Sequence, residues 1–190
     1  MNEVKTLIRS LIVETREYKV EYKVYKFAEL SEDSKETAIE KFREFNLMYD
    51  WWDCVFEDAK NVGITIEEFD TGRGAYCKGT IYDIEETAAK IITEHGNTCD
   101  THQTAAEYIR ERAELVKKHS DGVNTDIVAE DNEYDFDNDC GELDAEFTKS
   151  IFEDYRILLQ KECEYLNSDE AIIETIEAND YYFTKDGSID

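Results

Sequence analysis

Carboxylates are spaced on two predicted helices so that they project from one side with no cation between them. Glu170, Glu174 and Glu177 follow an i, i+4, i+7 pattern, and Glu142 and Glu146 repeat the four-residue step on the preceding helix. Each like-charge pair at i, i+4 costs about 0.2–0.5 kcal/mol of helix stability. Helix stability alone therefore does not explain the arrangement.

The rise between these carboxylates is close to the spacing of phosphates along a nucleic acid strand. Four helical residues rise about 6 Å, the order of the separation between neighbouring phosphates. A rigid array of this kind predicts binding in the basic channel of a DNA- or RNA-binding protein, with counterion release and weakening by salt. The alternative is a solvated acidic surface that keeps the protein soluble. The sequence leaves both interpretations open.

A second acidic segment has the spacing of a calcium-binding loop. With Asp135 as position one, Asp137, Asp139 and Glu146 occupy positions three, five and twelve, which carry oxygen ligands in an EF-hand. Position six, a glycine in that loop, is Cys140. We interpret the segment as an acidic connecting loop that flanks the helical carboxylates, and calcium binding stays an alternative.

Metal-ligating and catalytic groups are few. His95, Cys99 and His102 lie within eight residues, but no fourth ligand at zinc-finger spacing accompanies them. We interpret His95 as a histidine at the edge of the core, because it extends an apolar helical stripe. His119 is the remaining histidine, which leaves little material for acid–base catalysis. The sequence predicts neither an enzyme nor a bound metal or cofactor.

The whole chain is acidic, and the excess is concentrated late in it. The 190 residues carry 47 Asp and Glu against 21 Lys and Arg, a net charge of −26. Residues 121–190 hold 22 acidic and 4 basic side chains, a balance of −18. Direct binding to nucleic acid or to an anionic membrane is not expected, because both require Lys and Arg to neutralise phosphate. A basic protein is the partner that this charge predicts.

Cysteine usage and the lack of long apolar runs indicate the compartment. The five cysteines are odd in number, widely spaced and without a C-x-x-C pair, which is typical of free thiols in a reducing cytosol. The aliphatic stretches are only a few residues long, so no membrane span is expected. Acidic residues near the N-terminus argue against a signal peptide. The predicted location is the cytoplasm.

Apolar spacing predicts a mixture of helices and strands over residues 1–120. The expected elements are a helix over 4–12, a strand over 18–27, a helix capped by Ser31, a helix from Trp52 to Gly63, strands over 64–69 and 75–82, a helix capped by Asp83, and a helix opened by Asp100 with Ala105, Ile109 and Val116 on its apolar side. Trp51 and Trp52 are expected in the core rather than as anchors for a partner. The turn at Gly72-Arg73-Gly74 is too short for a phosphate-binding loop.

The last third is predicted to be mainly helical. Residues 121–141 form a polar connection with a short strand at 127–129, a long helix runs from about Glu142 to Leu166, Ser168 caps a final helix, and a strand covers 181–184. The residues expected to face inward on the long helix are Phe147, Ile151, Tyr155, Leu158 and Leu159.

The mixture of elements determines the expected fold class. Helices and strands follow one another without regular βαβ alternation, so we predict an α+β fold. We expect a single compact domain in which several helices pack on a small, mainly antiparallel sheet. Within it, residues 1–120 form a mixed scaffold, and residues 121–190 form an acidic helical segment packed on the same domain.

Four stretches carry a family resemblance. Residues 25–31, 38–43, 49–53 and 168–179 together resemble segments of a group of uncharacterised proteins encoded by bacteriophages, prophages and their bacterial hosts. The chain departs from that group at Asp70–Ala75, where relatives carry a Gln-Gly-Asp-Gly-Ala run. The resemblance implies an origin in a mobile genetic element and no particular mechanism. Anti-CRISPR and anti-restriction proteins are similar to this chain in charge.

Charge and resemblance together lead to a functional hypothesis. We expect a non-enzymatic inhibitor that places its acidic residues in the nucleic-acid channel of a host defence nuclease, such as a CRISPR effector or a restriction enzyme. A homodimer contact through the scaffold is left open. The alternative is an antitoxin-like or regulatory protein that binds a basic partner through a specific interface. The expected partner-binding residues are Asp135, Asp137, Asp139, Glu142, Glu146, Glu170, Glu174 and Glu177.

Overall fold

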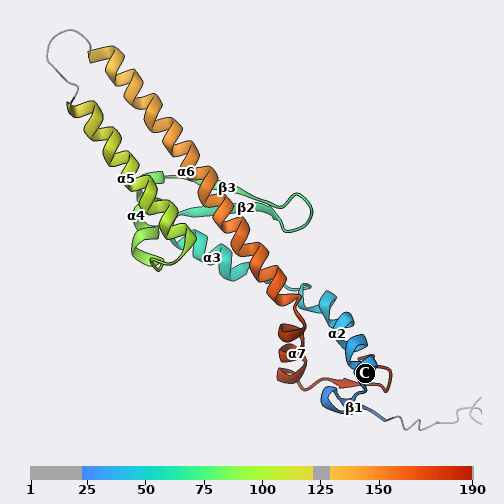
Figure 1. Ribbon diagram of the computed structural model, residues 1–190. Coiled ribbons are helices and arrows are strands. Elements are labelled where there is room, and N and C mark those ends of the chain that lie inside the picture. The colour runs from blue at the N-terminus through green and yellow to red at the C-terminus, as the bar shows by residue number, and fades with distance from the viewer. Residues whose placement is uncertain (1–22, 122–128, 190) are drawn as a thin grey trace, which may run out of the picture. The chain divides into compact units, whose positions relative to one another are not determined.

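The computed structural model describes residues 23–121 and 129–189. The predicted helix over 4–12 and the start of the strand over 18–27 lie outside these residues. In the described chain, six α-helices accompany two antiparallel, two-stranded sheets (Figure 1). The predicted α+β class is therefore confirmed, with the strands divided between two sheets. Across these same residues no helix is both long and apolar enough to span a bilayer.

The elements form two compact units. In chain order they are β1 (Tyr25–Lys26), the 3-10 helix η1 (Phe27–Glu29), α2 (Glu32–Asn46), α3 (Asp53–Asn61), β2 (Ile64–Asp70), β3 (Tyr76–Ile81), α4 (Ile84–Glu94), α5 (Asp100–Asp121), α6 (Ala129–Leu166), α7 (Asp169–Ala178) and β4 (Tyr182–Phe183). Of the described residues, those up to Lys41 and those from Thr175 form the terminal unit, and those from Phe42 to Glu174 form the central unit.

The terminal unit joins segments from the two ends of the sequence. β1 pairs antiparallel with β4, with Tyr25 opposite Phe183. The ring of Phe27 meets the ring of Phe183 edge to face at 6.2 Å between centroids. The Ser34 hydroxyl at the start of α2 donates to the Lys185 carbonyl at 2.9 Å. These contacts form a small core around β4. The predicted final strand over 181–184 is therefore confirmed.

The central unit is built on the hairpin of β2 and β3. The strands pair from Ile64 opposite Ile81 to Asp70 opposite Tyr76, with an irregularity between Ile66 and Glu68. α3 packs against β2, and α6 packs against β3 and α5. The hairpin and α3 appear where the apolar spacing predicts them.

α5 and α6 form an antiparallel pair. Their side chains meet in opposite order along the two helices: Thr104 bonds Asp154, and Lys118 contacts Asp139. On α5 the buried apolar residues are Ala105 and Tyr108, whereas Ile109 and Val116 are 41% and 51% exposed. The predicted inward position is therefore confirmed for Ala105 and wrong for Ile109 and Val116, because burial follows the α6 contact and not the largest aliphatic residues.

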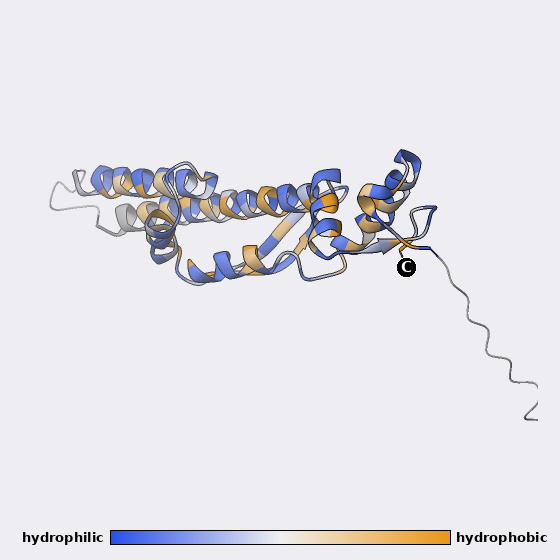
Figure 2. Ribbon diagram, turned by 90° about the horizontal axis from the view of Figure 1, so that it is seen from below, coloured by the Kyte–Doolittle hydropathy of each residue, from blue (hydrophilic) through white to orange (hydrophobic). Residues whose placement is uncertain are grey.

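The core of the central unit lies between the hairpin and α6. Hydrophilic and hydrophobic residues alternate along α6 in Figure 2, as expected for a helix with one buried side. Leu158 was expected inside, but it is 39% exposed, because Leu159 occupies the inward position. The buried residues are Ala59, Val62, Ile64, Ile66, Cys77, Ala88, Ile91, Ala105, Tyr108, Phe147, Ile151, Phe152, Tyr155 and Leu159.

α6 begins thirteen residues earlier than predicted. Residues 129–141 are helical, so the predicted connection is wrong over these residues, as is the last residue of the short strand at 127–129, while 122–128 lie outside the described chain. Phe136 and Cys140 explain the extension: Cys140 is buried, and the ring of Phe136 lies 5.0 Å from that of His119 on α5. An EF-hand loop must fold around its ion, so continuous helix over 135–146 excludes that loop in this structure.

The extended helix leads to a stability prediction at Gly141. This residue is exposed and helical, and a Cβ added to it would meet no atom within 4 Å. Glycine within a helix is about 0.5–1 kcal/mol less favourable than alanine. Gly141→Ala is expected to raise the free energy of unfolding by that amount, measured by urea denaturation. A loss of stability would contradict the continuous helix.

Candidate functional site

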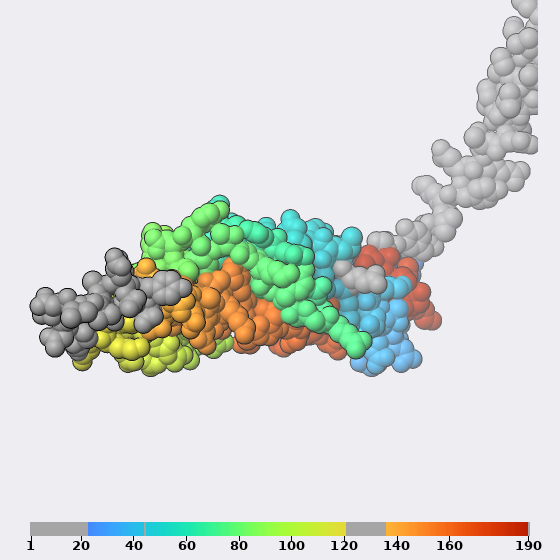
Figure 3. Space-filling view, turned by 90° about the horizontal axis from the view of Figure 1, so that it is seen from above, coloured from blue at the N-terminus to red at the C-terminus, as the bar shows by residue number. Residues whose placement is uncertain are grey.

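The acidic residues of α6 are strongly concentrated in its first half. Residues 119–148 contain eleven Asp and Glu and neither Lys nor Arg. Glu142 and Glu146 are exposed one turn apart on this helix. The part of α6 that follows residue 135 (orange in Figure 3) lies at the surface beside α5. We call Asp139, Glu142 and Glu146, which follow an i, i+3, i+7 spacing, the α6 ladder.

The members of the α6 ladder differ in how far they are neutralised. Asp139 lies 3.3 Å from Lys118 Nζ and 3.4 Å from His119 Nε2. Its hydrogen bonds with His119 and then Lys118 lower the pKa of this carboxyl. Glu142 and Glu146 form no ion pair with any described residue, and the Asn138 amide lies 3.5 Å from Glu142. The free negative charge of the ladder is therefore at Glu142 and Glu146.

The flanking aspartates occupy different sides of the helix. Asp135 lies in α6 at a position seven residues before Glu142, so the backbone places it on the side of the ladder. Asp137 is also exposed. It precedes Glu142 by five residues, so it is rotated by more than a third of a turn around the helix relative to Glu142. The helix thus separates Asp137 from the ladder.

The carboxylates of α7 form the predicted row. Glu170, Glu174 and Glu177 are all exposed on this helix, and none of them forms an ion pair with a described residue. Ser168 caps the helix through its hydroxyl, which accepts from the Ala171 N–H at 3.2 Å. Glu170 and Glu174 belong to the central unit, and Glu177 belongs to the terminal unit.

Tyr165 marks a second acidic cluster, at the junction of α6 and α7 in the central unit. Its hydroxyl donates to Glu174 Oε2 at 3.2 Å. The negative charge of Glu174, reinforced by Glu170 and Glu162, raises the pKa of Tyr165. We call Glu162, Glu170 and Glu174 the junction cluster. Tyr165 and Glu162 were not among the predicted partner-binding residues. The sequence signal that could have indicated them is their position, four residues or fewer from the end of the long helix.

The structure therefore places five of the eight predicted residues in two groups rather than one: Asp139, Glu142 and Glu146 in the α6 ladder, and Glu170 and Glu174 in the junction cluster. Sixteen residues of α6 separate Glu146 from Glu162, which is about 24 Å along the helix axis. Lys149, Arg156 and Lys161 lie between the two groups. A partner that contacts both groups needs an extended basic surface.

The predicted metal candidates do not form a metal site. The ring of His95 is 9% exposed, as expected at the edge of the core, and its Nδ1 lies 2.8 Å from Thr101 Oγ1. Cys99 is exposed at the start of α5. Across residues 23–121 and 129–189, no group of three or more His, Cys, Asp or Glu side chains is placed to hold a metal ion.

Cys77 and the two tryptophans contribute to the core of the central unit. All five cysteines are free. Cys77 is buried against the hairpin core, and burial raises the pKa of its thiol to about 11. Trp51 and Trp52 are partly buried and pack edge to face on Phe69 at 5.7 and 5.5 Å. The interpretation of both tryptophans as core residues is confirmed.

Asp144 lies between Glu142 and Glu146 in the sequence, but it does not belong to the ladder because Arg112 neutralises it. The Arg112 guanidinium donates to Asp144 Oδ1 at 2.9 Å and also pairs with Glu85. The Tyr108 hydroxyl donates to the same Asp144 oxygen at 2.7 Å. These contacts join α4, α5 and α6 and neutralise Asp144. The pairing depends on helix packing, so the sequence carried no signal for it.

The comparisons with known proteins give no match. No family model, curated protein or solved structure matches this chain.

Proposed function

We propose that this protein binds a basic surface of another protein, with the α6 ladder occupying the position of a nucleic acid backbone. The observation that supports this most is the exposure of Glu142 and Glu146, which form no ion pair with any described residue and lie in a stretch of sequence, 119–148, that contains eleven acidic residues and neither Lys nor Arg. A surface kept acidic only for solubility usually mixes both signs of charge. The absence of cations from this stretch favours recognition.

The ladder is rigid enough for recognition. Phe147 and Ile151, on the same helix, are 3% and 0% exposed in the core of the central unit. Cys140, between the ladder residues, is also buried. Carboxylates on an anchored helix lose little conformational freedom on binding, so more of the electrostatic attraction remains as affinity.

The partner we propose is a nucleic-acid-binding enzyme of a bacterial host, a defence nuclease such as a CRISPR effector or restriction enzyme. The protein would act as a non-enzymatic, cytoplasmic inhibitor. The resemblance of four segments to phage and prophage proteins supports this class, because a mobile element gains from blocking such an enzyme. The basic channel of a nuclease also provides the extended positive surface that two acidic groups about 24 Å apart require.

Competition with DNA tests this proposal. The tagged protein is used to capture partners from a bacterial lysate, and the captured nuclease is purified and offered a fluorescent DNA duplex. We expect the protein and the DNA to exclude each other, and the affinity of the protein to fall steeply between 50 and 300 mM salt, conditions chosen for the assay, as it does for DNA. Simultaneous binding of both would refute mimicry.

Two exposed residues of α5 favour the alternative of a specific apolar interface. Ile109 and Val116 are seven residues apart on one side of the helix, and both are more than two-fifths exposed. An antitoxin-like or regulatory protein would use such a surface for a basic partner. Its complex would persist at high salt, because apolar contacts are not screened. Ile109→Ser with Val116→Ser would then abolish binding, whereas a mimic would tolerate both changes.

A further inference from the structure

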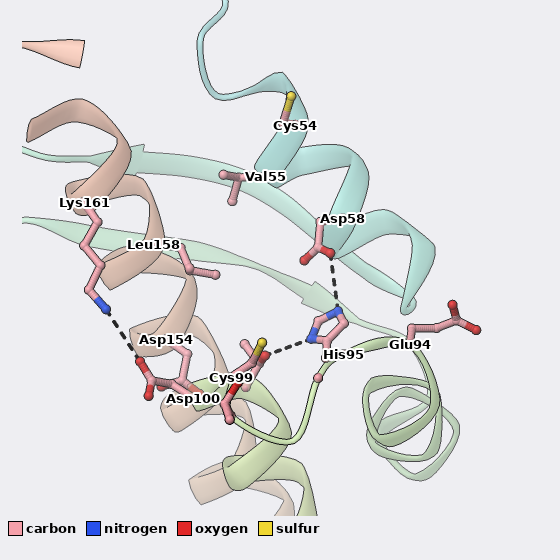
Figure 4. Close-up of a pocket in the computed structure, with 13 residues that line it drawn as sticks. Cys54, Val55, Asp58, Glu94, His95, Cys99, Asp100, Asp154, Leu158 and Lys161 are labelled. Carbon is pink, nitrogen blue, oxygen red and sulfur yellow. Dashed lines mark hydrogen bonds and ion pairs between the residues drawn. The ribbon is translucent and has the colours of Figure 1, made fainter. Parts of the chain in front are cut away.

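A pocket of about 630 Å³ opens in the central unit, away from the α6 ladder. It is bounded by α3, by the connection between α4 and α5, and by the second half of α6 (Figure 4). Part of its lining is aliphatic and part is acidic. Val55 and Leu158 supply aliphatic surface, and the acidic side chains that line it are Asp58, Glu94, Asp100 and Asp154.

The pocket holds more hydrogen-bond acceptors than donors. Among the described residues, Lys161 is the one lysine or arginine that lines it, and its Nζ lies 3.8 Å from Asp100. One carboxylate oxygen of Asp154, Oδ2, accepts a hydrogen bond from the Thr104 hydroxyl at 2.7 Å. Asp58 likewise accepts from the Tyr155 hydroxyl at 2.9 Å through Oδ2. Asp154 Oδ1 and Asp58 Oδ1 have no hydrogen-bond donor within the described chain.

His95 is the second observation that indicates a missing ligand. Its ring is nine-tenths buried in the pocket wall, and its Nε2 has no hydrogen-bond partner in the described residues. That nitrogen lies 3.4 Å from Asp58 Oδ1 but is not aligned for a hydrogen bond. When Nδ1 donates to Thr101, the Nε2 lone pair and the carboxylate are adjacent acceptors that repel each other. A positive charge at Asp58 relieves that repulsion.

We propose that this pocket binds a small organic cation, a primary ammonium or guanidinium group on a short aliphatic chain. Its N–H groups donate to Asp58 Oδ1 and Asp154 Oδ1, and its methylene groups lie against Val55 and Leu158. Both carboxylates are already oriented by Tyr155 and Thr104, so they need no rearrangement. This site is independent of the proposed function of the α6 ladder.

Burial strengthens the interaction at Asp154. Burial, followed by the negative charge of Asp100, raises the pKa of this carboxyl. A bound cation favours the ionised carboxylate and offsets that effect. The N–H groups matter as much as the charge, because a quaternary ammonium ion of similar size cannot donate to either oxygen. Specific binding is thereby distinguishable from attraction to a chain of net charge −26.

NMR of the histidine rings in the full chain tests the proposal. The protein has three histidines, so each ring can be followed separately. Putrescine, a short peptide with one arginine, and choline are titrated at pH 8 in 150 mM NaCl. We expect saturable shifts of the His95 signals with putrescine or the peptide, and none with choline. The His119 signals, beside Asp139, should stay unchanged. If only putrescine binds, the ligand of the pocket is a free amine. If only the peptide binds, the ligand is an arginine side chain of another protein.

Matched variants complete the test. Asp58→Asn with Asp154→Asn keeps acceptors for Tyr155 and Thr104 and should weaken binding at least tenfold. Glu36→Gln with Glu107→Gln makes the same charge change on exposed residues outside the pocket and should leave binding unchanged. Equal weakening in both double variants, equal shifts with choline, or unmoved His95 signals would overturn the proposal. If the pocket variant does not fold, the choline comparison on the unaltered protein decides.

Discussion

Gly79→Ala is expected to destabilise the central unit by at least about 3 kcal/mol, because the added methyl group has no space between the two strands. Gly79 lies on β3 opposite Ile66, next to the irregularity in the strand pairing. A Cβ at this position would lie 1.9 Å from the Thr65 carbonyl oxygen and 3.0 Å from the Ile66 Cα. Both are backbone atoms, which cannot move aside unless the strands separate and the hydrogen bonds between them are lost.

Urea unfolding followed by circular dichroism measures this effect. Gly141→Ala is the matched control, because the same methyl group is added to a helical glycine with open space around it. The two variants should change the free energy of unfolding in opposite directions. A Gly79→Ala protein within about 1 kcal/mol of the unaltered chain would show that the strands are not as close at this point as the structure has them.

The close approach at Gly79 shows where prediction from the sequence ends. Alternating apolar residues and a glycine-rich turn predict the hairpin, and Asp83 predicts the start of α4, whose Glu86 N–H donates to the aspartate at 2.9 Å. These signals act within a few residues of one another. Which glycine of the hairpin is indispensable depends on the irregular register of the two strands, which no local pattern contains.

α6 illustrates a different limit. Phe136, Cys140 and Phe147 are spaced i, i+4, i+11, and Leu143 completes the stripe, so a helical pattern was present in the sequence. The interleaved aspartates and Asn138 hid it, because those residues are typical of turns. Packing of this stripe on α5 outweighs their local preference. The orientation of α5 could not be predicted, because Tyr108 or Ile109 could each have faced inward until α6 was in place.

The candidate site was predicted in part for the same reason. The i, i+4, i+7 row on α7 follows from helical spacing alone. The pairing of Asp139 with Lys118 and His119, and the neutralisation of Asp144 by Arg112, require two helices to be packed together. The tertiary structure thus determines which carboxylates remain unpaired. Glu142 and Glu146 are the two of the α6 ladder that do, so they are the pair to test.

Reversing the charge of that pair is expected to weaken binding to the captured nuclease by at least about a hundredfold. Glu142→Lys with Glu146→Lys replaces two attractive contacts with repulsion in a basic channel. Close charge pairs across an interface contribute about 1.5 kcal/mol or more each, and every 1.4 kcal/mol corresponds to about a tenfold change in affinity. Surface plasmon resonance at 100 mM salt would measure the loss, and the salt dependence of the remaining affinity should also become shallower.

The control for this prediction separates a specific site from the general field of an acidic protein. Glu36→Lys with Glu57→Lys makes the same change in net charge on exposed helical residues of α2 and α3, outside the ladder and the junction cluster. At an ionic strength of 0.1 M, charges more than about 10 Å from a contact are largely screened. The control should therefore alter affinity only slightly, and both proteins should keep the circular dichroism spectrum of the unaltered chain. Equal losses in the two double variants would show that total charge attracts the partner and that the α6 ladder has no special role.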